Sequence, residues 1–241
     1  MRFFILGDSW GVGEWKKPNG VFESIPDTST GYFLTQAGHS VTNISAGSAG
    51  NFGQLRHAYW TLKEDSAYDY IIWFHTESVR DIEEILIRNP DEGKIQFPDF
   101  KMEYDFNKSI EYLNKQNYSY AQSIFEEFKI PFIIIEGQSP MDRQSMKEFS
   151  FLKFSIPWLK DLLNLQSDIP CNTFFNWEKI QRVLAHYGFD EKKFIFANID
   201  DLNKSQEIIN KTAMSPAFPD NVHPDAKSHN ILANRILQLI S

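Results

Sequence analysis

Cysteine, basic residues and long apolar runs are all scarce in this sequence of 241 residues. One cysteine, Cys171, cannot form an internal disulfide, so nothing in the composition points to an oxidising compartment. Lys and Arg number 24 against 32 Asp and Glu, and the formal charge of −8 argues against nucleic-acid or anionic-membrane partners. No signal-peptide pattern opens the chain, and no window reaches the ~20 apolar residues of a membrane span. We therefore expect a cytoplasmic protein.

Apolar runs that alternate with helical patterns dominate what is present. Runs rich in Ile, Phe or Val predict strands at 2–6, 40–44, 70–74, 131–135 and 193–196, several of them continuous, as in strands buried on both faces. Helices are predicted at 28–37, 52–63, 78–87, 106–128, 177–186, 202–210 and 225–240. This alternation predicts an α/β fold, a three-layer α/β/α, flavodoxin-like domain with about five parallel strands. We expect one domain over 1–241, with insertions near 89–104 and 137–170.

The first predicted strand ends in Gly7-Asp8-Ser9-Trp10. A serine just past the carboxyl end of a parallel strand lies where open α/β sheets bind ligands, and its amide can donate to an oxyanion. The same residues also fit an Asp/Ser turn or a helix N-cap. A phosphate cradle at Gly11 and Gly13 is disfavoured, because the dinucleotide fingerprint needs a third glycine where Lys16 stands.

A second motif, Asp220 to His223, precedes the last predicted helix. An Asp three residues before a His can hold the ring through Nδ1 and leave Nε2 facing a nucleophile, although each residue alone also fits an ordinary loop. Together with Ser9 they supply a nucleophile, a base and an orienting carboxylate. A metal site that adds Asp225 and His229 lacks the usual ligand spacing, so we expect no metal.

These motifs resemble the GDSL/SGNH hydrolase family. Gly7-Asp8-Ser9 is similar to its first block, the stretch 43–51 to its second, and Asp220 to His223 to its last; the resemblance fades between about 90 and 190. It implies a serine esterase or acylhydrolase in which Ser9 is the nucleophile and Asp220 and His223 complete a triad. It also implies that the amides of Ser9 and of Gly47 or Ser48 hold the oxyanion.

The third block of that family departs from the pattern here. It usually reads Gly-x-Asn-Asp, with the asparagine as an oxyanion donor, whereas the strand 70–74 is followed by His75-Thr76-Glu77-Ser78. A carboxylate at Glu77 would repel an oxyanion, while the hydroxyl of Thr76 or Ser78 could donate to it. Losing one oxyanion donor can cost ~10²–10³ in rate, so this departure from the family pattern bears on the activity and not on the fold.

The resemblance implies hydrolysis of small acyl esters, including carbohydrate-linked O-acetyl esters, through an acyl-enzyme and without a cofactor. Trp15 and Phe22 could offer rings to an apolar or sugar group, whereas Trp73 fits the core better. An alternative is a binding protein that kept the fold and lost efficient catalysis, and a third is a phosphate-binding flavodoxin-like protein. The side chains expected to bind substrate are Asp8, Trp10, His75 and Glu77.

Overall fold

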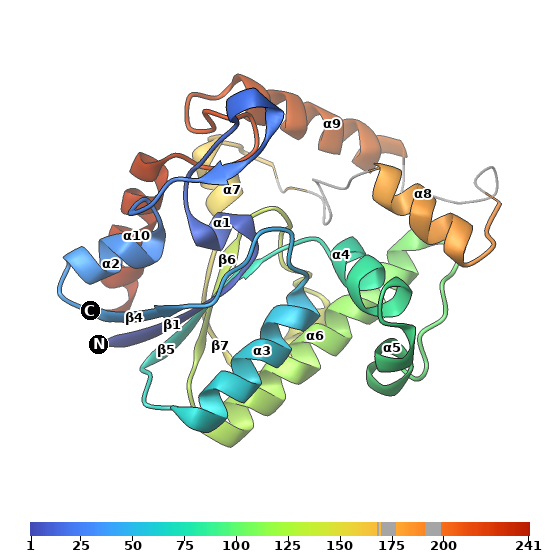
Figure 1. Cartoon of the computed structure of the whole chain (residues 1–241), viewed down its shortest axis with the longest axis horizontal. Coiled ribbons are helices and arrows are strands. Elements are labelled where there is room, and N and C mark those ends of the chain that lie inside the picture. Colours follow the sequence, from blue (N-terminus) through green and yellow to red (C-terminus); the bar gives the residue numbers. More distant parts are fainter. Residues whose placement is uncertain (168, 170–176, 191–198) are drawn as a thin grey trace.

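A parallel sheet with strand order β4-β1-β5-β6-β7 forms the centre of the protein, in a computed structural model that describes residues 1–167, 169, 177–190 and 199–241 (Figure 1). Phe3 pairs with Val41 on one side of β1 and with Tyr70 on the other. The carboxyl ends of the strands therefore meet at one edge of the sheet. The strands are β1 (Arg2–Gly7), β4 (Ser40–Asn43), β5 (Tyr70–His75), β6 (Phe132–Glu136) and β7 (Leu152–Ile156).

Each face of the sheet carries its own hydrophobic core. Phe3 and Ile5 of β1 point into one core and Phe4 and Leu6 into the other, because successive side chains alternate across a strand. The helices α2 and α10 cover the first face, and α3 and α6 lie side by side on the second (Figure 1). The three layers confirm the predicted α/β/α class.

Ten α-helices fall within the described residues. The long helix α6 begins where Asp105 accepts a hydrogen bond from the Asn107 amide at 3.2 Å and ends at Lys129, whose φ of 60° is left-handed. The helices are α1 (Ser9–Val12), α2 (Thr30–Gln36), α3 (Asn51–Glu64), α4 (Val79–Asp81), α5 (Pro90–Gln96), α6 (Phe106–Phe128), α7 (Trp158–Leu162), α8 (Trp177–His186), α9 (Ile199–Met214) and α10 (Ala226–Ile240).

Shorter elements complete the described chain. A two-stranded antiparallel pair, β2 (Trp15–Lys16) and β3 (Glu23–Ser24), follows α1. The 3₁₀ turns are η1 (Pro18–Gly20) and η3 (Ser145–Glu148), and the π-helical turn η2 (Ile82–Ile87) continues α4. A third apolar cluster lies under η2, α5, α8 and the first half of α6.

Most described elements lie where the sequence predicts them, and the differences fall in the two predicted insertions. Strands β1, β4, β5 and β6 lie at the predicted positions, but the predicted strand 193–196 and Cys171 lie outside the described residues. The predicted insertion 137–170 contains the edge strand β7, and the predicted insertion 89–104 contains α5. Within the described residues, no helix combines the length and apolarity that a membrane crossing needs.

Candidate active site

Ser9 lies at the first position of α1, directly after the turn that ends β1. Gly7 permits that turn: its φ is +146°, and a Cβ there would lie 2.5 Å from the Cβ of Phe74 on β5. Asp8 caps α1 by accepting a hydrogen bond from the Trp10 amide at 3.0 Å. The Ser9 amide consequently has no partner within the helix and faces the carboxyl edge of the sheet.

The structure brings Ser9, His223 and Asp220 together from opposite ends of the chain. His223 Nε2 lies 3.0 Å from Ser9 Oγ, and Nδ1 lies 2.6 Å from Asp220 Oδ2. Asp220 Oδ1 also accepts the amides of Val222 at 2.9 Å and His223 at 2.6 Å. Burial alone would raise the pKa of Asp220, but these hydrogen bonds outweigh it and lower the pKa. A carboxylate held in this way favours the tautomer in which Nδ1 carries the proton and Nε2 accepts one.

Two aromatic side chains cover the His223 ring. Trp15 stacks on it with ring centres 5.2 Å apart, and Phe22 meets it edge-on at 5.3 Å. Trp15 Nε1 also donates to the Ser9 carbonyl at 2.9 Å, which ties β2 to α1. Ser9 and His223 are each only 6% exposed. The rings of Trp15 and Phe22 contribute to this burial because they cover the His223 ring.

The loop between β4 and α3 carries Gly47 and Ser48, the expected oxyanion donors. Ala46 N donates to the Gly7 carbonyl at 3.0 Å and holds the loop against the end of β1. Ser48 has a left-handed φ of 63°, and the amides of Gly47 and Ser48 make no hydrogen bond in the described part of the chain. Both residues line a cavity of about 350 Å³, and their amides remain available to a ligand.

The hydroxyls of Thr76 and Ser78, which the sequence suggests as further donors to the oxyanion, both have acceptors within the protein. Thr76 Oγ1 donates to Glu77 Oε2 at 3.1 Å, and its amide donates to Asn51 Oδ1 at 3.1 Å. Ser78 Oγ donates to Asn114 Oδ1 on α6 at 2.5 Å. Thr76 Oγ1 also lies 3.4 Å from Gln138 Oε1, and because each hydroxyl has one proton, donation to an oxyanion would replace one of these hydrogen bonds.

The four side chains expected to bind substrate, Asp8, Trp10, His75 and Glu77, are all almost fully buried. Trp10 belongs to the core and packs against Trp158 and Phe218, and Trp73 is likewise a core residue, as its apolar strand predicted. The ring of His75 lies against Trp73, and its Nδ1 is 3.0 Å from the Ser139 carbonyl. Burial lowers the pKa of His75. Asp8 and Glu77 are buried as partners of an arginine.

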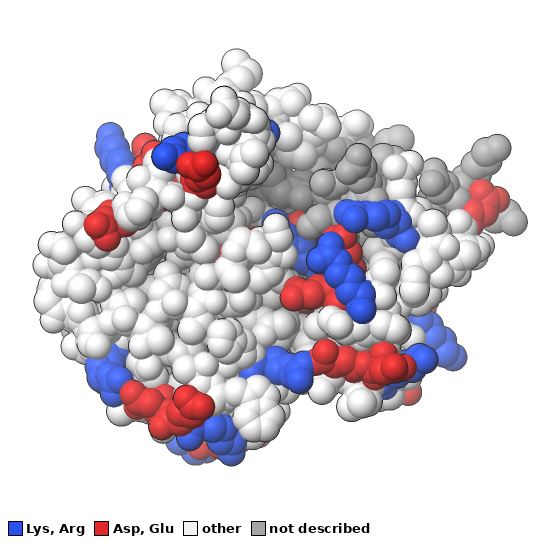
Figure 2. Space-filling model, viewed as in Figure 1, with Lys and Arg blue, Asp and Glu red and all other residues white. Residues whose placement is uncertain are grey.

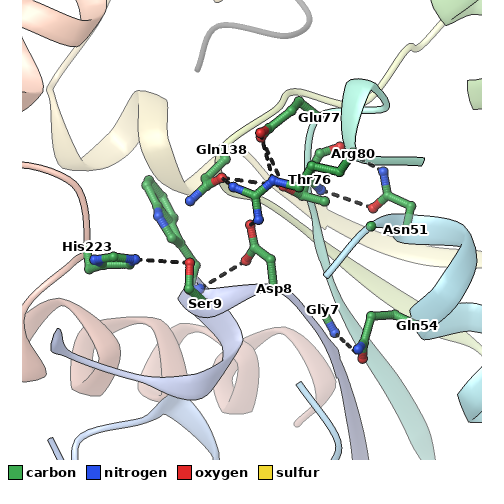
Figure 3. A network of polar contacts seen from close by, with 12 residues as sticks. Gly7, Asp8, Ser9, Asn51, Gln54, Thr76, Glu77, Arg80, Gln138 and His223 are labelled. Carbon is green, nitrogen blue, oxygen red and sulfur yellow. Dashed lines mark hydrogen bonds and ion pairs between the residues drawn. The ribbon is translucent and has the colours of Figure 1, made fainter. Parts of the chain in front are cut away.

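That arginine, Arg80, was missed by the sequence analysis. Its Nε donates to Glu77 Oε1 at 2.7 Å, and its Nη2 donates to Gln138 Oε1 (Figure 3). Its Nη1 makes no hydrogen bond and lies 3.6 Å from Asp8 Oδ2. Burial raises the pKa of Asp8 although Arg80 opposes the rise. The spacing of three residues between Glu77 and Arg80 is a helical ion-pair spacing that could have drawn attention to it.

Two further carboxylates hold the loop of Gly47 and Ser48 from the side of β5. Asp81 Oδ1 accepts the Phe52 amide at 2.8 Å, and Glu84 Oε2 accepts the Gly50 amide at 2.9 Å, so both bind the N-terminus of α3. Asp81 Oδ2 accepts from Asn117 on α6 at 2.8 Å. Burial raises the pKa of Asp81 to about 7.

Within the described residues, no group of three or more His, Cys, Asp or Glu side chains could hold a metal ion. His229 Nδ1 lies 2.9 Å from Thr30 Oγ1, and burial lowers its pKa to about 3. Asp225 accepts the Ser228 amide at 2.7 Å as the cap of α10. The side chains of His229 and Asp225 therefore contact the ends of α2 and α10 through these hydrogen bonds.

The chain matches several solved structures over nearly its whole length. TesA is 11% identical with a TM-score of 0.45, covering 100% of this chain and 98% of TesA. Axe2, an acetylxylan esterase from Geobacillus stearothermophilus, is 13% identical with a TM-score of 0.40, covering 100% and 94%. A lipase/acylhydrolase from Enterococcus faecalis is 12% identical with a TM-score of 0.41, covering 100% and 95%. No family model and no curated protein matches the sequence. Similarity at this level assigns no activity to the chain.

Proposed function

We propose that the protein is a serine ester hydrolase of the GDSL/SGNH type, with Ser9 as nucleophile, His223 as general base and Asp220 as the residue that orients it. The observation that carries the proposal is the continuous chain of contacts from Ser9 Oγ to His223 Nε2 at 3.0 Å and from His223 Nδ1 to Asp220 Oδ2 at 2.6 Å. A serine hydroxyl is a weak nucleophile until a base can take its proton, and this arrangement supplies that base.

The reaction proceeds in two halves. Ser9 Oγ attacks the ester carbonyl carbon while its proton passes to His223 Nε2, and a tetrahedral oxyanion forms. The carbon–oxygen bond to the alcohol then breaks, and His223 gives its proton to the departing alcohol, which leaves an acyl group on Ser9. Water, activated by His223, attacks the acyl carbonyl and releases the acid. The Ser9 amide and the amides of Gly47 and Ser48 are the backbone donors available to the oxyanion.

The substrate class that we propose is a small acyl ester, with a carbohydrate-linked O-acetyl group as the preferred form. The cavity beside Gly47 and Ser48 is lined largely by polar and charged side chains, which suits a hydroxyl-rich group better than a long acyl chain. The partly exposed Phe22 and the ring of Trp15 give an apolar wall at His223 against which a sugar ring can lie.

The proposal is tested with p-nitrophenyl acetate, acetylated sugars and a phosphonate that labels active serines, followed by mass spectrometry. Wild type is expected to turn over the acetate and to carry one adduct at Ser9, whereas Ser9→Ala does neither. Ser119→Ala is the matched control, because Ser119 is an exposed serine on α6 whose hydroxyl donates to the Lys115 carbonyl. Folded wild-type protein that is neither labelled nor active would refute the proposal and favour the binding-protein alternative.

A further inference from the structure

The strongest unexplained feature of the molecule is the buried guanidinium of Arg80 beside the candidate site. Its side chain is 11% exposed, and its two hydrogen-bonded nitrogens are anchored by Glu77 from β5's end and Gln138 from β6's end. The third nitrogen, Nη1, is buried and makes no hydrogen bond. A buried donor without an acceptor is costly, and such groups in native proteins need an explanation.

The unsatisfied nitrogen lies beside the residue that precedes the proposed nucleophile. It is 3.6 Å from Asp8 Oδ2, and Asp8 immediately precedes Ser9 and caps its helix. Figure 3 shows His223 approaching Ser9 from one side and the Arg80 guanidinium lying on the other, with Glu77 beyond it. When a serine attacks a carbonyl, the oxygen that gains charge lies away from the base, so it develops on the Arg80 side.

Arg80 lines the same cavity as Gly47 and Ser48. Its outer part carries Arg88 and Arg182, but both bind the single carboxylate oxygen Glu83 Oε1 at 3.0 Å. Figure 2 shows positive and negative side chains intermixed on this face, without one sign prevailing. The outer arginines are therefore neutralised in part, whereas Arg80 has a buried nitrogen that makes no hydrogen bond and lies at the end of β1, 3.6 Å from Asp8 Oδ2.

We infer that Arg80 is a catalytic residue, which donates a charged hydrogen bond from Nη1 to the oxyanion and replaces the neutral side-chain donor absent after β5. The inference rests on the proposed function. The carboxylate of Glu77, which would repel an oxyanion if it faced one, instead accepts a hydrogen bond from Arg80 Nε and offsets the charge of the guanidinium. A donor held by Glu77 and Gln138 needs no reorganisation as the oxyanion forms, which is the condition for a large rate effect.

The test compares Arg80→Gln and Arg80→Lys with wild type, and Arg235→Gln serves as the control because that arginine is partly exposed on α10 and pairs with Asp161 outside the cavity. Steady-state kinetics on p-nitrophenyl acetate are combined with binding of a trifluoromethyl ketone, which forms a tetrahedral anionic adduct on an active serine. Arg80→Gln is expected to lower kcat ~10²–10³-fold with little change in KM, and to weaken ketone binding in proportion. Arg235→Gln should change neither.

Several outcomes would overturn the inference. Arg80→Gln as active as wild type, while Ser9→Ala is inactive, removes Arg80 from catalysis and leaves the proposed function standing. A lower kcat with unchanged ketone binding identifies Arg80 as a structural ion-pair residue only. Wild type that shows neither turnover nor a Ser9 adduct refutes the proposed function and the role of Arg80 together.

Arg80→Lys keeps the test decisive if Arg80→Gln fails to fold. A lysine preserves the ion pair with Glu77, but one ammonium cannot reproduce a fork that bonds Glu77 and Gln138 and still presents a third nitrogen. We expect folded Arg80→Lys, verified by its melting temperature, to lose at least about tenfold in kcat. Full activity in Arg80→Lys would contradict the inference.

Discussion

The substitution Asp81→Asn should make the protein less sensitive to pH. Asp81, the last residue of α4, is fully buried against the N-terminus of α3. Burial raises its pKa from the usual 3.8 to about 7, more than the hydrogen bonds from Asn117 and the Phe52 amide lower it. Between these two pH values the unfolded chain loses its proton while folded Asp81 keeps it. The free energy of unfolding therefore falls as pH rises through this window, by up to about 1.36 kcal/mol per pH unit.

The whole effect is about 4 kcal/mol, reached once the pH passes 7. Asparagine has nearly the same shape and no proton to lose, so the variant lacks this loss of stability. Its oxygen can still accept the Phe52 amide. Asn117 Oδ1 has no hydrogen-bond partner, so a flip of that amide lets it accept from the new asparagine. Asp81→Asn should fold as wild type does.

The assay is urea unfolding at several pH values from about 4 to about 8, followed by circular dichroism. The difference in unfolding free energy between Asp81→Asn and wild type is expected to grow in favour of the variant across this range. Asp91→Asn is the control, since that side chain is 98% exposed. A difference that stays constant with pH would refute the reasoning. A difference that grows in favour of wild type would mean that ionised Asp81 stabilises the N-terminus of α3 instead.

Three further substitutions test the site. Gly7→Ala places a Cβ 2.5 Å from that of Phe74 at a φ of +146°, so it should lower the melting temperature, measured by calorimetry, and abolish turnover; normal activity would contradict the account of the β1 turn. Asp220→Asn should lower kcat by about 10²–10⁴ while the protein stays folded, and a smaller loss in ester kinetics would argue against its orienting role. Trp15→Phe keeps the stacking on His223 but loses the hydrogen bond to the Ser9 carbonyl, so unfolding should show a cost of about 1 kcal/mol. An unchanged unfolding free energy would mean that this hydrogen bond is not stabilising.

The central strands were predictable because each is a run of consecutive apolar residues. Phe3 to Leu6 and the apolar runs of β5 and β6 are buried on both faces, so each gives an uninterrupted signal. The edge strand β7 (Leu152–Ile156) gives a weaker one, since an edge strand is only partly buried and its residues are mixed. The sequence pattern therefore predicts only an insertion over 137–170 and not this strand.

Some residues of the candidate site can likewise be predicted from local sequence, and others cannot. Ser9, Asp220 and His223 lie in short motifs whose spacing states their chemistry, and the structure brings them within hydrogen-bond distance. The residues after β5 form hydrogen bonds with partners far away in the chain, and no local sequence pattern reveals these partners. Ser78 is taken by Asn114, 36 residues on, and Arg80 is held by Gln138, 58 residues on.

The segment after β5 supports two different kinds of proposed oxyanion donor at once. Glu77 fixes the guanidinium of Arg80, while Asp81 and Glu84 hold the N-terminus of α3 and with it the loop of the Gly47 and Ser48 amides. Groups that share one support do not contribute independently. Removing Asp81 or Glu84 should therefore weaken the contribution of Arg80 as well as that of the loop, because an oxyanion that shifts with the loop amides also changes its distance from Arg80. Such coupling is what the proposed role of Arg80 requires, because Arg80 and Glu77 belong to the same segment after β5 as the carboxylates that position the backbone donors.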